Sequence, residues 1–220
     1  MAGLIHGVEA ETVRRNLAEV RDEIAVAASK AGRDPAGVEI VAATKYIPVE
    51  EMGALAEAGV EIVGENRAQD LETKRERYGD AFAWDFIGHL QSRKVKVVLP
   101  HVRLIHSVAS DSVLRQLGTH GTPDTEVLVE VNVAGEGSKS GIAPGELAAF
   151  IERCPVRVTG LMTMPPFSED PEASRPDFAT LRELAERHGL ERLSMGTTQD
   201  FAVAVEEGAT LVRIGTRLYA

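Results

Sequence analysis

Cysteine is nearly absent from this chain of 220 residues, which contains only Cys154. A single thiol excludes an intramolecular disulfide and a cysteine-rich metal site. Its position before Pro155 is more typical of a small packed hydrophobe than of a reactive thiol. Such sparing use of cysteine fits a reducing compartment, so we expect a cytoplasmic protein.

Long hydrophobic runs and excess positive charge are missing as well. The formal net charge is −10 and the sequence pI is about 5.1. This surface repels phosphate backbones and anionic membranes, so we expect neither nucleic acid nor a membrane as partner. No segment approaches the roughly 20 apolar residues of a membrane span. The first ten residues also lack the basic and apolar regions of a signal peptide.

The residues that are present are those of an ordinary globular domain. Hydrophobic residues make up 44% and charged residues 26%, enough for a sizeable core. A complete α/β barrel fits this length at the short end of its size range. Because no linker or low-complexity segment divides the chain, we expect a single domain over residues 1–220. No exposed apolar stripe stands out, which favours a monomer.

The first element is predicted to be a helix outside the repeating part of the chain. Apolar residues recur there at helical spacing, at Val13, Leu17, Val20, Ile24, Ala27 and Ala31. Gly32 and Pro35 then end the pattern. We therefore assign residues 1–36 to an extra N-terminal helix that covers one end of the core, and residues 37–220 to the main fold.

After residue 37, short β-rich runs alternate with helical segments. Eight strands are expected, at about Val38–Ala43, Glu61–Val63, Ala83–Ile87, Arg103–Ser107, Glu126–Val133, Val156–Leu161, Arg192–Ser194 and Leu211–Ile214. Helical segments are expected at Glu50–Ala58, Arg67–Tyr78, Asp111–Leu117, Gly145–Glu152, Arg175–His188 and Asp200–Glu207. Strands that alternate with helices pair in parallel. Eight units indicate a closed (β/α)8 TIM barrel, an α/β fold, rather than an open sheet.

Polar residues gather where the predicted strands end. In a barrel of this kind the site forms at the carboxyl ends of the strands. The residues at those positions are Thr44, Lys45, Gly64, Glu65, Asn66, Gly88, His89, Gln91, His106, Ser107, Asn132, Met162, Thr163, Ser194, Gly196, Thr197, Thr198, Arg213, Gly215 and Thr216. Their convergence is stronger evidence for a site than any one of them.

Lys45 directly follows a buried apolar run. We expect its ammonium to project from a strand end where desolvation lowers its pKa, which would make the amine nucleophilic toward a carbonyl. The alternative is a lysine that extends to solvent at the barrel rim. Position alone leaves both possibilities open.

Arg213 lies within the last predicted strand. Alternation places Leu211, Arg213 and Gly215 on one face and Val212 and Ile214 on the other. A guanidinium inside a barrel needs partners. A structural ion pair with Glu130 is one solution, and the ring nitrogen of a bound ligand is another.

Two segments suit a phosphate group. The stretch Ser194-Met195-Gly196-Thr197-Thr198 leads from a strand into a helix with hydroxyls and a glycine, and Gly215-Thr216 forms a second turn with close backbone access. The loop from Gly135 to Gly141 lacks Walker A spacing, so we interpret it as flexible, with Lys139 near the site. No metal-ligand spacing and no serine-nucleophile elbow is present, so we expect a metal-free site.

Several motifs in one order resemble a known family. They are Val-Ala-Ala-Thr-Lys45-Tyr, Val-Gly-Glu65-Asn66, Phe86-Ile-Gly-His-Leu-Gln91-Ser-Arg-Lys94, Glu130-Val-Asn132, Lys139-Ser-Gly141, Gly160-Leu-Met-Thr-Met164, Ser194-Met-Gly196 and Val212-Arg-Ile-Gly215-Thr216. From about Val38 onward the chain resembles the pyridoxal phosphate homeostasis proteins, also called the YggS or proline-synthetase-associated family.

The resemblance implies a barrel like the N-terminal domain of alanine racemase, of PLP fold type III, without the second domain of the racemase. It implies a Schiff base of pyridoxal 5′-phosphate (PLP) on Lys45, Asn66 beside the ring, and Arg213 at the pyridine nitrogen. The phosphate region is implied to contain Ser194, Gly196, Thr197, Thr198, Gly215 and Thr216. Thr198 departs from the family pattern, which often has serine there. The chain also ends at Ala220, without the glycine usual after the final aromatic.

This interpretation predicts a protein of PLP homeostasis that binds the cofactor and delivers it to PLP-dependent apoenzymes, with little or no turnover. An arginine partner leaves the pyridine nitrogen unprotonated and the ring a poorer electron sink. A racemase also needs acid–base groups on both substrate faces, and the chain ends before a second domain. The alternatives are a slow PLP-dependent amino-acid racemase with Lys45 as one base, and a Schiff-base aldolase without cofactor.

Overall fold

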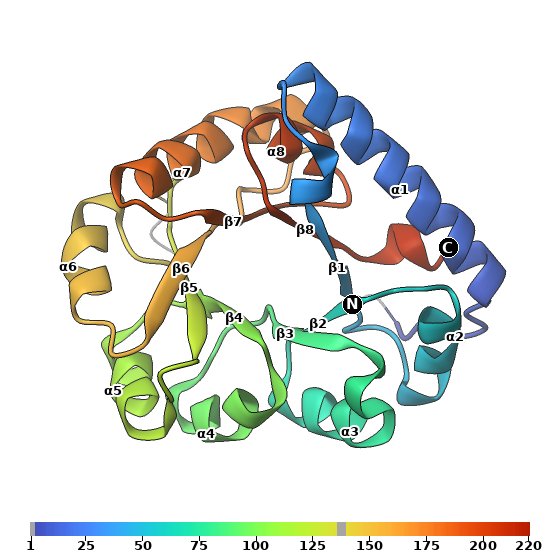
Figure 1. Ribbon diagram of the computed structural model, residues 1–220, viewed down its shortest axis with the longest axis horizontal. Coiled ribbons are helices and arrows are strands. Elements are labelled where there is room, and N and C mark those ends of the chain that lie inside the picture. Colours follow the sequence, from blue (N-terminus) through green and yellow to red (C-terminus); the bar gives the residue numbers. More distant parts are fainter. Residues whose placement is uncertain (1–2, 136–139) are drawn as a thin grey trace.

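The computed structural model describes residues 3–135 and 140–220, and its centre is a closed barrel of eight parallel strands (Figure 1). Neighbouring strands follow the order of the chain, and the last pairs with the first. The strands are β1 (Glu39–Ala43), β2 (Ile62–Glu65), β3 (Ala83–Phe86), β4 (Leu104–Val108), β5 (Glu126–Glu130), β6 (Arg157–Met162), β7 (Arg192–Thr197) and β8 (Leu211–Ile214). The predicted TIM barrel is therefore confirmed.

Helices surround the barrel as an outer ring (Figure 1). They are α1 (Ala10–Lys30), α2 (Met52–Glu57), α3 (Ala68–Tyr78), α4 (Val95–Val98), α5 (Asp111–His120), α6 (Leu147–Glu152), α7 (Arg175–Arg187) and α8 (Phe201–Glu206). Helix α4 was not among the predicted helices. It has four residues between two 3-10 turns, which is too short for a helical period to appear in the sequence.

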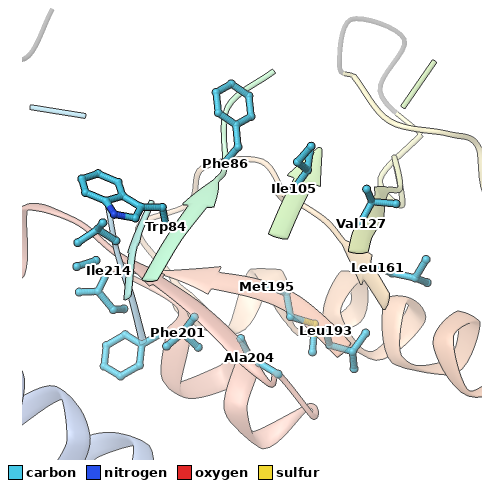
Figure 2. Packing of buried hydrophobic residues seen from close by; sticks show 14 of the residues in the cluster. Trp84, Phe86, Ile105, Val127, Leu161, Leu193, Met195, Phe201, Ala204 and Ile214 are labelled. Atoms are coloured by element: carbon cyan, nitrogen blue, oxygen red, sulfur yellow. The ribbon is translucent and has the colours of Figure 1, made fainter. Parts of the chain in front are cut away.

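Strand alternation divides the apolar residues into two layers. The outward-facing layer packs between the sheet and the helices, and Figure 2 shows Leu193 and Met195 of β7 on the side of the strand where α8 carries Phe201 and Ala204. A smaller cluster fills the barrel interior with Val41, Ile62, Leu104, Leu128, Met162 and Leu211. The barrel interior is thus packed with side chains rather than open.

Helix α1 belongs to the outer ring, so the prediction that it covers one end of the core is wrong. It runs along the outside of the barrel beside α8 and α2 (Figure 1). Its apolar stripe, which includes Val13, Val20 and Ile24, is buried. Asn16 on the same helix donates to the carbonyl oxygen of Ala220 at 2.9 Å. An amphipathic helix buries its apolar stripe against a neighbouring surface, and here that surface is the outside of the barrel beside α8 and α2.

Two strands differ in length from the prediction by three residues, and the others differ by at most one. Strand β5 stops at Glu130, and beyond it Val131 makes only an isolated bridge with Ile142. Strand β7 continues to Thr197 through a shift of register against β8. Both differences lie at the carboxyl ends, where they shape the rim. None of the helices in the described ranges is long and apolar enough to cross a bilayer.

Candidate functional site

A cavity of about 580 Å³ opens at the carboxyl ends of the strands. Its volume is that of a small-molecule site. Of the predicted site residues it is lined by Lys45, Asn66, Thr197, Thr198, Arg213, Gly215 and Thr216. Ser194 and Gly196 lie outside its wall. Residues far apart along the chain therefore meet here because every strand ends at the same face of the barrel.

Lys45 lines this cavity from a turn that follows β1. The amide of Ile47 donates to the carbonyl oxygen of Thr44 at 2.9 Å and closes that turn. The Lys45 side chain is exposed, with its Nζ 5.0 Å from the centroid of the Tyr46 ring. The prediction that Lys45 is desolvated is therefore wrong. Lys45 lies in the turn after β1 rather than in the buried strand, so its side chain extends to solvent.

A second lysine, Lys74 on α3, is the buried one. Its Nζ donates to the Thr44 carbonyl oxygen at 2.8 Å and to Oε1 of Glu65 at 2.5 Å. The Thr44 hydroxyl donates to the same carboxylate oxygen at 2.5 Å. This buried ion pair thus fastens the backbone just before Lys45 to β2 and α3. Sequence position alone did not identify Lys74, because on its helix it is one of several charged residues.

Arg213 reaches the cavity floor from inside the barrel, as alternation along β8 predicted. Its Nη1 donates to Ser194 Oγ at 2.5 Å and its Nη2 to the Thr163 carbonyl oxygen at 3.0 Å. In the part of the chain that the structure describes, no carboxylate lies within ion-pair distance of Arg213, so the pairing with Glu130 that the sequence left open does not form. Burial lowers the pKa of Arg213 to about 10, against the opposing charges of Asp200 and Glu130. The group remains a cation at neutral pH.

The turns after β7 and β8 form one corner of the cavity. The Gly215 amide approaches the Thr198 hydroxyl oxygen at 3.3 Å, so these two turns touch. The Thr197 amide and hydroxyl instead donate to Oδ1 of Asp200 at 2.7 and 3.1 Å. Thr198, Gly215 and Thr216 are therefore the hydroxyl- and amide-bearing residues of this corner, while Thr197 serves mainly to hold the turn.

Ser194 and Gly196 belong to β7 but do not line the cavity. The Ser194 hydroxyl is fully buried and is engaged by Arg213 and His106. Gly196 has φ +88°, and a Cβ there would lie 2.6 Å from the Ala204 methyl carbon. Both residues thus act on the cavity through their neighbours, Ser194 through Arg213 and Gly196 through the path of the turn.

Asn66 follows β2 and lines the cavity at a close approach of two backbone segments. A Cβ on Gly88 would lie 2.2 Å from the Asn66 carbonyl oxygen, so a side chain at residue 88 would displace this segment. The Asn66 side-chain oxygen is buried and has no hydrogen-bond partner. An unpartnered buried oxygen that borders a cavity is a candidate contact for a ligand donor.

Further residues complete the wall. Tyr219, Tyr46 and Ile5 were not predicted from the sequence, while His89, Ser107 and Met162 stand at predicted strand ends. Glu130 also lines the cavity and accepts from Ser140 at 2.6 Å. Tyr219 was missed because it follows the last strand by five residues. Lys139, predicted near the site, lies outside the described residues.

His106 also departs from its predicted place. It ends β4 in the sequence, but its side chain is fully buried inside the barrel and does not line the cavity. Burial lowers the pKa of His106 although Asp85 opposes this, so the ring is neutral. Burial raises the pKa of Asp85, but hydrogen bonds from His106 and Arg103 and the charge of Arg103 outweigh it, and the net pKa is lowered. Within residues 3–135 and 140–220, no three His, Cys, Asp or Glu side chains gather as metal ligands would.

Comparison with known proteins identifies the family. A family model described as alanine racemase, N-terminal domain, matches residues 10–220. A pyridoxal phosphate homeostasis protein of Aquifex aeolicus is 40% identical over 217 residues, which cover 92% of this chain and 95% of that protein. The chain belongs to the pyridoxal phosphate homeostasis proteins. This family assignment confirms the resemblance found in the sequence motifs and the fold that it implied.

Solved structures of similar proteins share the whole barrel. A protein of Bifidobacterium adolescentis superposes with a TM-score of 0.86 at 31% identity, over 99% of this chain and 98% of that one. PipY of Synechococcus elongatus, solved with PLP bound, gives a TM-score of 0.77 at 28% identity, over 94% and 100%. The similarity to known proteins thus extends from sequence motifs to tertiary structure.

Proposed function

We propose that this chain binds PLP in the cavity, with Lys45 as its covalent anchor, and that it serves PLP homeostasis by holding and releasing the cofactor. One observation carries the proposal: a single cavity is lined by a primary amine, Lys45, by a guanidinium, Arg213, and by the touching turns of Thr198 and Gly215. These groups match the three chemical parts of PLP, which are an aldehyde, a pyridine nitrogen and a phosphate. Relatives named for PLP homeostasis and the PLP-bound PipY support this assignment.

Lys45 supplies the reactive amine. PLP, when bound, supplies an aldehyde that condenses with primary amines. Lys45 would hold the cofactor through its Nζ, because this side chain places a primary amine on the cavity wall. Because the amine is exposed, holding the phosphate and ring must supply much of the effective concentration that favours this condensation.

The other residues bind and orient. We assign the phosphate to Thr198, Gly215 and Thr216, with Thr197, Gly196 and Ser194 supporting that corner and the floor. Arg213 is assigned to the ring nitrogen and Asn66 to the ring edge. Thr198 stands where the family often has serine, so it keeps the hydroxyl and adds a methyl group. This hydroxyl can still donate its proton to the phosphate while its oxygen accepts from the Gly215 amide.

Turnover is expected to be slow for two reasons. A guanidinium at the ring nitrogen does not protonate it, so carbanionic states are weakly stabilised. Tyr219 lines the cavity with Lys45, but burial and the nearby Glu65 charge raise the pKa of Tyr219 above its usual value, so the phenol stays protonated and cannot take a proton from a substrate. Delivery to apoenzymes, a monomeric state and a cytoplasmic location remain predictions.

The test is an absorption titration with PLP. We expect native protein to develop a visible Schiff-base band that Lys45→Arg and Lys45→Ala lack. Lys45→Arg keeps the positive charge, so it separates condensation from electrostatic attraction. Lys96→Ala, an exposed lysine on α4, is the matched control and should behave as native protein. A band that persists in Lys45→Arg would refute Lys45 as the anchor.

Two alternatives are distinguished by further measurements. A slow racemase would exchange the α-deuterium of a labelled amino acid in a Lys45-dependent manner, whereas a binding protein would show little exchange. An aldolase without cofactor would show no visible band after incubation with PLP. Rapid exchange, or the absence of a band, would overturn the proposed function.

A further inference from the structure

A chain of hydrogen bonds crosses the barrel beneath the cavity. Nη1 of Arg213 lies 2.5 Å from Ser194 Oγ, and Ser194 Oγ lies 2.8 Å from Nδ1 of His106. Nε2 of His106 then lies 3.1 Å from Oδ2 of Asp85. The chain joins β8, β7, β4 and β3, and only Arg213 reaches the cavity wall. These side chains, 128 positions apart at the extremes, meet because the sheet closes on itself.

The donor order along this chain follows from the chemistry of the groups. A guanidinium only donates, so Ser194 accepts from Arg213 and has its own proton left for His106. Nδ1 of His106 is then the acceptor, and the ring proton lies on Nε2, which donates to Asp85. Arg103 fixes the far end, because its Nε donates to Oδ1 of Asp85 at 2.9 Å. The donor and the acceptor of each hydrogen bond between Arg213 and Asp85 are therefore determined.

Burial makes this order hard to change. Asp85, His106 and Ser194 are each 0% exposed, and Arg213 is 5% exposed. A missing partner there leaves a buried polar group unsatisfied, which is costly. Arg213 uses one hydrogen on Nη1 and one on Nη2 for protein contacts. Its remaining hydrogens are held in a fixed plane.

We propose that Asp85, His106 and Ser194 are positioning residues that hold the Arg213 guanidinium at the cavity floor, and so set its donation to the ring nitrogen of PLP. The inference rests on the proposed function, and it assigns roles to three residues that do not themselves touch the cofactor. Ser194 acts directly on Arg213, His106 sets the direction of the Ser194 proton, and Asp85 sets the His106 tautomer.

The experiment compares Ser194→Ala with Thr159→Val. Thr159 on β6 carries a buried hydroxyl that has no hydrogen-bond partner. Its removal is a matched control, because Thr159 takes no part in the hydrogen bonds that link Arg213 to Asp85. We expect Ser194→Ala to bind PLP about tenfold more weakly, as loss of one hydrogen bond to a charged group implies. We also expect it to alter the pH midpoint of the visible band, whereas Thr159→Val should match native protein in both. A purely structural role for Ser194 would lower thermal stability and leave the band unchanged.

A second measurement does not depend on PLP. In protein labelled with nitrogen-15 at histidine, the signals of His106, assigned with His106→Gln, should show the Nε2–H tautomer, and its Nδ1 shift should change in Ser194→Ala. An Nδ1–H tautomer in native protein, or a Ser194→Ala variant with native affinity and band, would overturn the inference while native PLP binding stands. A native protein without any visible band would overturn the proposed function, and the inference with it.

Discussion

At the scale of single residues, buried titratable groups determine how the protein responds to acid. His106 is fully buried and neutral beside Asp85. In the unfolded chain a histidine takes up a proton below a pKa of about 6.5, but burial lowers the pKa of native His106. Below pH 6.5 the unfolded state therefore binds more protons, and stability falls as pH falls.

We predict that the free energy of unfolding drops by about 1.4 kcal/mol at most for each pH unit below 6.5 through His106 alone. Lowering of the Asp85 pKa adds stability that is present above about pH 4 and is lost below it. Urea unfolding at pH 7.5, 6.5 and 5.5 measures this slope. In His106→Gln the overall stability is lower, but its fall between pH 6.5 and 5.5 should be shallower. An equal slope in both proteins would contradict the prediction.

Gly196 provides a second prediction at this scale. Its φ of +88° is strained for other residues, and an added Cβ would lie only 2.6 Å from the Ala204 methyl carbon, so no side chain fits. Gly196→Ala should therefore cost roughly 1–3 kcal/mol through strain and overpacking. Gly37→Ala, where no atom lies within 4 Å and φ is unstrained, should stay within about 1 kcal/mol of native. The comparison of urea midpoints tests this, and equal midpoints would show that α8 can move away.

At the scale of elements, the turn that carries Lys45 is fastened by a helix from the next unit of the barrel. Lys74 on α3 and Glu65 on β2 form an ion pair that is 6% and 0% exposed, and Lys74 also binds the Thr44 carbonyl oxygen. Position along the chain drew attention to Lys45 as the buried lysine. Packing assigns burial to Lys74, because α3 covers β2 while the turn after β1 leaves the barrel wall.

Removal of one member of this pair should be strongly destabilising. We predict that Lys74→Met costs roughly 3–5 kcal/mol, since it leaves the Glu65 carboxylate buried without its cation. Lys74→Met combined with Glu65→Gln should recover a large part of that loss. Urea unfolding of the two single variants and the double variant gives the coupling energy. If the stability losses of the two single variants add up to the loss of the double variant, Lys74 and Glu65 are not coupled, which would contradict the ion pair seen in the structure.

At the scale of the whole molecule, a closed barrel that binds a ligand only when folded must be stabilised by it. With free PLP at 100 times its dissociation constant, mass action adds about 2.7 kcal/mol. We predict a rise in Tm of roughly 5–10 °C for a chain of this size. Pyridoxal, which has the aldehyde but no phosphate, should give a much smaller shift. Equal shifts with both compounds would argue against the phosphate corner of Thr198, Gly215 and Thr216.

Much of the fold could be predicted from the sequence because its signals are local. The signals depend on neighbouring residues in the chain. They include the alternation of strands and helices, and the alternation within Leu211–Ile214 that places Arg213 on the inner face. Helix α4 could not be predicted because four residues carry no period. The end-covering role given to α1 was wrong because the sequence shows which face of a helix is apolar but not which surface receives that face.

The sequence by itself determined the family, the number of strands and the residues at the strand ends, since these follow from short motifs and local periodicity. Only the tertiary structure decided which lysine is buried, that Arg213 bonds to Ser194 rather than to a carboxylate, and that His106 lies beneath the cavity instead of on its wall. The physical reason is that barrel closure joins strands whose residues are distant in the chain. Burial and hydrogen-bond partners are properties of that closure, and no local pattern contains them.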